Sequence, residues 1–157
     1  MLRGILYATV VCLLYSVASV GGVEAQERSA VTVFEDVYIF DDLDAMRALR
    51  VARRPLCLFG HTHVVAGYNV TNKTDIVAPV RELSIRIPPN GGSRFLVNCG
   101  AVGQPRDGDP RAAYGMLDSS ARTLTLERVE YDVSAAQAKI VAAGLPDVLA
   151  QRLAVGR

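Results

Sequence analysis

The chain has 157 residues, of which 50% are hydrophobic and 21% charged, and its formal net charge is +1. A chain of this length and composition can bury one hydrophobic core, which excludes a fully disordered protein and favours one domain. The near-neutral charge carries no signature of nucleic-acid binding, because such binding needs a concentrated basic face. The basic cluster of Arg47, Arg50, Arg53 and Arg54 has helical spacing, and we interpret it as a solvated helix face.

Residues 1–25 have the layout of a secretory signal. One positive charge, Arg3, precedes an uncharged apolar run over residues 5–20, and Val23-Glu24-Ala25 resembles a cleavage site. The run is short for a membrane span. Two interpretations stay open: this signal-like segment directs export, or it is a spurious N-terminus.

Beyond this segment the sequence predicts alternating strands and helices. In chain order we predict an extended segment over 31–40, a helix over 43–51 capped by Asp41-Asp42, strands over 56–59, 64–70, 77–87 and 94–98, a hairpin of 112–117 with 123–131, and two C-terminal helices. The first C-terminal helix begins at the capping box Ser134-Ala135-Ala136-Gln137, and Pro146 begins the second. The alternation of the hairpin changes phase near Glu127-Arg128, which predicts a β-bulge.

The two histidines of the chain, His61 and His63, directly follow the apolar strand predicted over 56–59. Loops after strands are where α/β folds usually bind ligands. Neutral imidazole binds zinc, manganese, iron or nickel, so the pair is a candidate metal site. Taken alone, the pair is more typical of an ordinary surface loop. A second apolar strand ends at Asn98 and leads into a glycine-rich, charged loop over 99–111.

The three cysteines, Cys12, Cys57 and Cys99, lack the spacing of a disulfide framework or a zinc knuckle. We interpret Cys57 and Cys99 as small buried hydrophobic residues.

Two segments resemble a known family. Residues 58–63 read Leu-Phe-Gly-His-Thr-His, and residues 98–112 read Asn-Cys-Gly-Ala-Val-Gly-Gln-Pro-Arg-Asp-Gly-Asp-Pro-Arg-Ala. In motif, order and spacing they resemble the closing half of the calcineurin-like metallophosphoesterases, specifically the small bacterial phosphodiesterase branch, over residues 34–157. The resemblance implies an α/β fold, namely the C-terminal half of a four-layer α/β/β/α sandwich, with mostly one mixed or antiparallel sheet and flanking helices.

The resemblance also implies roles for individual residues. His61 would ligate the second metal and His63 the first, in a centre of divalent manganese, zinc, iron or nickel. The loops beside this centre would contain Gly60, Thr62, Asn98, Gly100 and Gly103, and residues 104–111 would order them. No catalytic residue beyond the metal ligands and no organic cofactor is implied. Cys99 and Ala101 stand where the family usually has proline and serine, neither of which is a metal ligand.

The main departure from the family is the number of ligands. The family has an Asp-x-His, a Gly-Asp, a Gly-Asn-His and a lone histidine before its Gly-His-Thr-His, whereas no histidine precedes His61 here. The similarity breaks off near residue 33, which leaves 34–157 as a partial domain. Two metals that share a bridging hydroxide need more ligands than two imidazoles. We therefore expect a truncated phosphomonoesterase or phosphodiesterase that is inactive alone, so that its status as an enzyme stays open.

The alternative hypothesis is an exported, non-catalytic half-domain that acts as a binding or association module. A half-domain would leave a sheet edge and an apolar face uncovered, so we expect self-association through the exposed sheet. The C-terminal helices should pack on this sheet through Ile140, Leu145, Leu149 and Leu153. The family resemblance implies a cytoplasmic location and phosphoester substrates, whereas a true signal in residues 1–25 would imply export.

Overall fold

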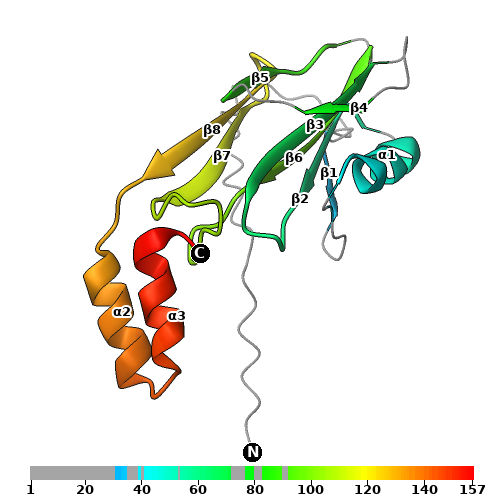
Figure 1. Cartoon of the computed structure of the whole chain (residues 1–157). Coiled ribbons are helices and arrows are strands. Elements are labelled where there is room, and N and C mark those ends of the chain that lie inside the picture. The colour runs from blue at the N-terminus through cyan, green and yellow to red at the C-terminus, as the bar shows by residue number, and fades with distance from the viewer. Residues whose placement is uncertain are drawn as a thin grey trace, which may run out of the picture.

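The computed structural model describes residues 31–34, 39, 41–52, 54–71, 77–79, 83–89 and 92–157 (Figure 1). The signal-like segment 1–25 and Arg53 lie outside the described residues. The elements are β1 Val31–Phe34, α1 Asp42–Val51, β2 Leu56–Phe59, β3 Val65–Thr71, β4 Val77–Pro79, β5 Ser84–Arg86, β6 Ser93–Cys99, β7 Ala112–Asp118, β8 Thr123–Val129, α2 Val133–Ala142, α3 Asp147–Gln151 and the 3-10 helix η1 Arg152–Val155. Within the described ranges no helix has the length and apolar character that a membrane span requires.

The larger sheet has five strands in the order β1-β2-β6-β3-β4. Strands β1, β2 and β6 run parallel, while β3 pairs antiparallel with both β6 and β4. All four residues of β2 are buried, which explains its continuous apolar run, because a strand covered on both faces has no polar side. The parallel pairing aligns Phe59 with Asn98, so β2 and β6 end at the same edge of the sheet.

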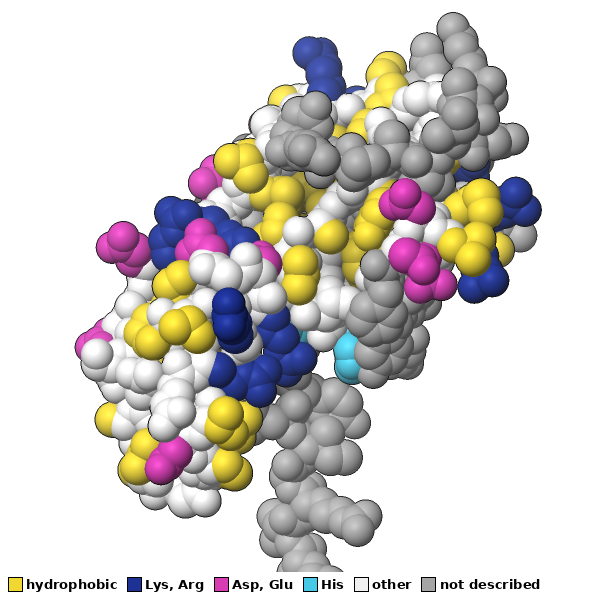
Figure 2. All heavy atoms as spheres, viewed as in Figure 1, with side chains coloured by type: hydrophobic (Ala, Val, Ile, Leu, Met, Phe, Trp, Pro, Cys, Tyr) yellow, Lys and Arg dark blue, Asp and Glu magenta, His cyan; other side chains and the backbone are white. Residues whose placement is uncertain are grey.

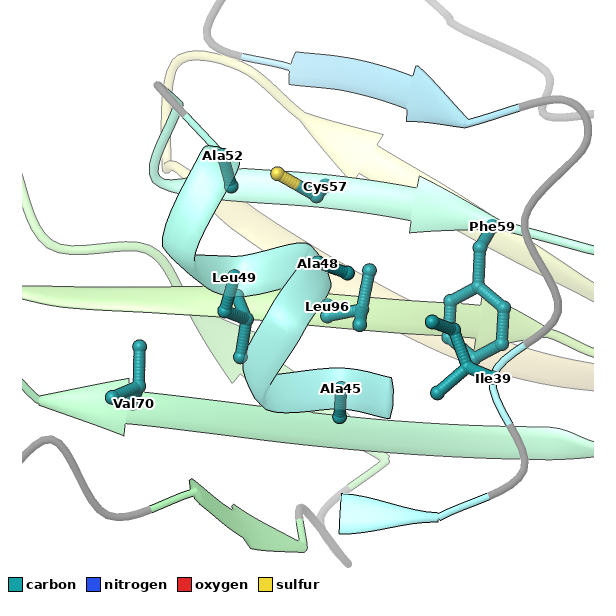
Figure 3. Packing of buried hydrophobic residues seen from close by; sticks show 9 residues of the cluster. All are labelled: Ile39, Ala45, Ala48, Leu49, Ala52, Cys57, Phe59, Val70 and Leu96. Atoms are coloured by element: carbon teal, nitrogen blue, oxygen red, sulfur yellow. The ribbon is translucent and has the colours of Figure 1, made fainter. Parts of the chain in front are cut away.

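Helix α1 covers one face of this sheet (Figure 3). Its N-cap is Asp41, whose carboxylate accepts a hydrogen bond from the backbone N–H of Asp44 at 2.9 Å, as the sequence predicts. Ala45, Ala48 and Leu49 are buried against the sheet, at the i, i+3 and i+4 spacing of one helix face. Arg47 and Arg50 lie on the exposed face of the helix, which confirms that part of the predicted solvated cluster.

The smaller sheet has the order β5-β8-β7 and packs on the other face of the larger sheet. The core between them contains residues of both sheets: Leu56, Leu58, Val97, Cys99, Ile85, Ile87 and Leu124. The described core thus has three layers, α1 and two sheets. Cys57 faces α1 and Cys99 faces the smaller sheet, and both are buried as predicted. The mixed α/β class is confirmed, with its strands divided between two sheets.

Two predictions about strands are wrong. The single strand over 77–87 is two strands, β4 and β5, which belong to different sheets, and Leu83 is exposed while Ile85 is buried. The hairpin has no bulge, because β7 and β8 pair residue for residue from Ala112 with Val129 to Asp118 with Thr123. The change of phase has another cause: Arg128 lies on the same face as buried Leu124 and pairs there with Asp107.

The C-terminal helices also differ from the prediction. Helix α2 is capped by Asp132, whose carboxylate accepts from the N–H of Ala135 at 2.8 Å, rather than by Ser134. Helices α2 and α3 pack against each other and against η1, and stand beside the end of β8 instead of covering a sheet (Figure 1). Helix α2 has no buried residue and Leu145 is exposed, whereas Leu153 is buried. Gln137 joins the pair by donating a hydrogen bond to the carbonyl of Ala150 at 2.8 Å.

Candidate functional site

The loops that follow β2 and β6 meet at one edge of the larger sheet. Phe59 and Asn98 are partners in the parallel register, so residues 60–63, which follow β2, and residues 100–103, which follow β6, leave the sheet side by side. The predicted site residues Gly60, His61, Thr62 and His63 belong to the first loop, and Gly100 and Gly103 to the second. Because the carboxyl ends of neighbouring parallel strands lie together, the topology alone brings the two motifs into contact.

Asn98 connects the two loops. Its side chain is fully buried, and its Nδ2 donates to the carbonyl of Gly60 at 3.2 Å and to Oγ1 of Thr62 at 2.9 Å. Its Oδ1 accepts a hydrogen bond from the backbone N–H of Gly100 at 2.9 Å. A buried amide needs such partners to replace its hydrogen bonds to water. The same hydrogen bonds fix the histidine loop relative to β6.

Both histidines have a left-handed backbone. The φ angle is +73° at His61 and +62° at His63, values that non-glycine residues rarely adopt. The N–H of Thr62 donates to the carbonyl of Gly60 at 2.9 Å, which closes a three-residue turn with His61 at its apex. Such conformations cost free energy and are concentrated at functional sites, where surrounding contacts enforce them. Here the contacts of Asn98 enforce the turn.

The imidazole of His63 is oriented by the second loop. Its Nδ1 lies 2.9 Å from the carbonyl oxygen of Gln104. A carbonyl only accepts, so Nδ1 carries the proton and Nε2 keeps its lone pair. Burial lowers the pKa of His63, the positive charge of Arg106 lowers it further, and the Gln104 carbonyl partly opposes both effects. His63 is therefore neutral at pH 7, which is the form that binds metals.

Segment 104–111 is fastened to the histidine loop at two further points. The N–H of Arg106 donates to the carbonyl of His63 at 3.0 Å. One carboxylate oxygen of Asp107 accepts from the N–H of Val65 at 3.0 Å and also from Arg128. Burial raises the pKa of Asp107, but the hydrogen bonds from Arg128 and Val65 outweigh it, so the pKa lies below its usual value.

The two predicted glycines of the second loop, Gly100 and Gly103, differ in their surroundings. Gly100 has φ +86°, and a Cβ there would lie 2.7 Å from Cβ of Ala113 and 2.8 Å from Cγ2 of Val65. A larger residue at this position would push the second loop off β7 and β3. Gly103 is exposed, and a Cβ there would meet nothing within 4 Å. Of these two glycines, packing therefore requires Gly100 and not Gly103.

The donors at this site suit a divalent metal, but their number is small. A histidine whose second ring nitrogen donates to a backbone carbonyl is typical of metal ligands, and His63 has this arrangement. Within the described ranges, no group of three or more histidine, cysteine, aspartate or glutamate side chains could hold a metal. The carboxylates of Asp107 and Asp109 face arginines. The described residues thus offer two candidate ligands, His61 and His63.

Sequence reasoning missed the individual contacts that support the loops. Asp107 lies in the predicted segment 104–111, but its pairing with Arg128 was not foreseen. The change of phase at Arg128 was the available signal, because a charged residue on the inner face of a strand needs a buried partner. Arg152, in η1, carried no signal, although its charge acts on both His63 and Arg106.

Comparisons with known proteins agree with this architecture. No family model matches the chain. The crystal structure of a metallophosphoesterase from Sphaerobacter thermophilus is similar, with a TM-score of 0.66 and 37% identity, over 76% of this chain and 49% of that chain. The uncharacterized protein MJ0912 of Methanocaldococcus jannaschii is 45% identical over 64 residues, which are 41% of this chain and 26% of that protein. The chain thus has a metallophosphoesterase-like fold and spans about half the length of the bacterial structure.

Proposed function

We propose that this chain provides the two-histidine part of a metal-dependent phosphoesterase site, which hydrolyses phosphomonoesters or phosphodiesters when the remaining ligands are present. The observation that supports it most is the orientation of His63. Its Nδ1 is held by the Gln104 carbonyl, on a strained loop shared with His61, in a fold similar to that of a metallophosphoesterase. By the family resemblance the metal is divalent manganese, zinc, iron or nickel.

The residues of this chain would prepare the site rather than perform the bond cleavage. A bound divalent metal supplies a nucleophilic hydroxide and stabilises charge on the phosphoryl oxygens. Asn98 and Thr62 hold the left-handed turn that positions His61. The backbone carbonyl of Gln104 fixes the tautomer of His63. The carboxylate of Asp107 accepts a hydrogen bond from the N–H of Val65, two residues after His63, and so holds the backbone there.

We further propose that the 157-residue chain by itself hydrolyses phosphoesters slowly or not at all. The sequence has two histidines in total, and the nearby carboxylates of Asp107 and Asp109 face Arg128 and Arg111. A centre with two metals needs additional ligands and a bridging carboxylate. In this proposal the 157 residues of this chain do not supply those ligands.

A non-catalytic association module is the second candidate. The supporting observation is the exposed apolar surface of the C-terminal helices, where Val141, Leu145 and Val148 are each about half exposed or more. Apolar side chains that cluster at a surface are typical of interaction sites. This candidate requires neither histidine, so metal binding separates the two functions.

The test is metal binding and hydrolysis by the purified full chain. The metal-free protein is incubated with Mn²⁺ or Zn²⁺, bound metal is measured by mass spectrometry, and hydrolysis of an aryl phosphodiester is followed. His63→Asn preserves a side chain that tolerates positive φ, and should weaken metal binding by about tenfold or more. Arg86→Gln, at an exposed position of β5, is the control and should bind as the wild type does.

Two outcomes would contradict the proposal. If His63→Asn binds metal as tightly as the wild type, the histidine loop is not a metal site. Two bound metals with rapid turnover that requires His63 would show that this chain is a complete enzyme, and would overturn the expectation of low activity.

A further inference from the structure

Arg128 is a charged residue on the inner face of β8, at a position where an apolar side chain is the usual choice. Its side chain is 19% exposed, and it lies on the same face of the strand as Leu124, which is fully buried. Removing a guanidinium from water costs free energy that an ion pair does not always return. The stability of the smaller sheet alone therefore does not account for an arginine here.

The guanidinium of Arg128 contacts three residues of one segment. Its Nη2 donates to the carboxylate of Asp107. Its Nη1 donates to the carbonyl oxygens of Asp109 and Arg111, at 3.3 Å each. Its Nε lies 3.9 Å from the carboxylate of Asp109. One side chain thus spans residues 107–111, and basic and acidic side chains lie together near the end of β8 (Figure 2).

The same segment holds the loop of His63 at three points. Nδ1 of His63 lies 2.9 Å from the carbonyl oxygen of Gln104, and the N–H of Arg106 donates to the carbonyl of His63 at 3.0 Å. The carboxylate oxygen of Asp107 that accepts from the guanidinium also accepts from the N–H of Val65 at 3.0 Å. A single oxygen, Oδ2, therefore connects β8 to the backbone two residues after the histidine.

The shape of segment 104–111 depends on contacts of this kind, because the segment contains no helix or strand. It has a second anchor at the C-terminal end of the chain, where the N–H of Gly108 donates to the carbonyl of Gly156 at 3.0 Å. This hydrogen bond does not involve Arg128. Replacing Arg128 should therefore change the orientation of the segment without releasing it.

We propose that Arg128 is a positioning residue for the candidate metal ligand His63. Through Asp107 and the carbonyls that follow it, the guanidinium holds segment 104–111 so that the Gln104 carbonyl meets Nδ1 of the ring. The ring proton then stays on Nδ1, and Nε2 keeps the lone pair that a metal needs. The inference rests on the proposed function, and it gives the smaller sheet a part in a site whose histidines follow a strand of the larger one.

The test is the tautomer of His63 in the metal-free full chain, read from the nitrogen chemical shifts of the ring at pH 8, where its lowered pKa leaves the imidazole neutral. The signal is assigned by its loss in His63→Asn. The wild type should carry the proton on Nδ1. Arg128→Gln loses the charge and most contacts with residues 107–111, and should show a mixture of both tautomers, because the hydrogen bond of one ring nitrogen decides which nitrogen is protonated.

Arg122→Gln is the matched control. Arg122 directly precedes β8, and its guanidinium donates to the carbonyls of Ile87 and Pro88 at 3.1 and 2.9 Å. This variant loses comparable hydrogen bonds in the same sheet, but to the segment that follows β5 rather than to segment 104–111. The tautomer of His63 should therefore stay as it is in the wild type.

Thermal unfolding shows whether each variant folds. If Arg128→Gln does not, Arg128→Lys decides the result: its ammonium keeps a charge beside Asp107 but cannot span three residues, so part of the Nε2–H form should appear. A wild-type tautomer in the folded Arg128 variant would overturn the positioning role, and so would an equal change in Arg122→Gln. Failure of both Arg128 variants to fold would make this residue a support of the whole fold and would also overturn the role.

Metal binding separates this inference from the proposed function. Arg128→Gln should bind Zn²⁺ about tenfold more weakly than the wild type, an effect typical of losing the support of a metal-ligating histidine, and Arg122→Gln should bind it equally. Binding that requires His63 but is unchanged in Arg128→Gln would overturn the positioning role alone. A tautomer that depends on Arg128, in a chain whose metal binding ignores His63, would support the positioning role and overturn the phosphoesterase.

Discussion

The carbonyl oxygen of Gln104 lies 2.9 Å from Nδ1 of His63, although the two residues are 41 positions apart in the chain. This contact joins the loop after β2 to the loop after β6. It also places the ring proton on Nδ1, so that Nε2 keeps its lone pair. Nε2 is the nitrogen left for a metal. The predictions below concern this contact and the residues that hold the two loops in place.

The first prediction concerns the titration of His63. Burial and the charge of Arg106 lower its pKa, so the ring should titrate below 6.5 in the metal-free protein. A folded-state pKa below the unfolded one means that protonation favours unfolding. His63 should therefore reduce stability progressively as pH falls from 6.5 through its folded pKa. The measurement is NMR of the imidazole carbons, and a midpoint at or above 6.5 would contradict the burial argument.

The second prediction concerns the buried amide of Asn98. Asn98→Leu keeps the approximate volume but removes the hydrogen bonds to Gly60, Thr62 and Gly100. We expect a loss of about 3 kcal/mol in the free energy of unfolding, because buried groups are left without partners. Urea unfolding measures it. Asn69→Leu, at a half-buried position of β3, is the control and should change stability by less than about 1 kcal/mol.

The third prediction concerns the carboxylate of Asp107. Asp107→Asn should destabilise the protein by about 2 kcal/mol at pH 7, since hydrogen bonds to a charged, mostly buried group are weakened. The pKa of Asp107 is lowered, so its contribution is present above the unfolded pKa and is lost as pH falls through the folded pKa. Unfolding by urea at pH 7 and pH 3 should therefore show a smaller difference at pH 3.

The exposed Asp147→Asn, in the first turn of α3, is the control for this experiment. A difference between wild type and Asp107→Asn that is the same at both pH values would show that the effect is steric rather than electrostatic.

The fourth prediction compares two glycines of the same loop. Gly100→Ala should destabilise the protein by about 2–4 kcal/mol, because positive φ and a close approach to Ala113 and Val65 both oppose a Cβ. Gly103→Ala should be nearly neutral, because a Cβ there meets open space. Thermal unfolding of the two variants is the measurement. Equal melting temperatures would mean that the loop rearranges around the added methyl group at low cost.

Local patterns predicted the elements that lie next to the site. The run Leu56–Phe59 indicated a strand buried on both faces, and Asp41 indicated the start of α1. In both cases the signal is local. In β2 it is an uninterrupted run of apolar residues, and in α1 it is the side chain of the capping aspartate. The family resemblance, rather than a local pattern, predicted that Gly60, Thr62 and Asn98 lie beside the histidines, and the parallel pairing of Phe59 with Asn98 brings the two segments together.

Long-range side-chain contacts could not be predicted in the same way. Arg128 breaks the apolar alternation of β8 because it reaches Asp107, and a single sequence does not distinguish this from a bulge. Asp132 and Ser134 are both good caps, and the structure uses Asp132. Helix α2 is rich in alanine and has no distinct apolar face, so its sequence could not indicate that it packs on α3 instead of a sheet.

Because Phe59 pairs with Asn98, the candidate site forms only when β2 and β6 pair in this register. If β6 slipped by one residue along β2, the amide of Asn98 would move to the opposite face of the sheet and away from Gly60. The turn at His61 would then lose the contacts that hold it. Correct pairing of two buried strands during folding is thus also the step at which the histidine loop acquires its shape, and chains with shifted strands would not hold the two histidines in the orientation that the proposed metal site needs.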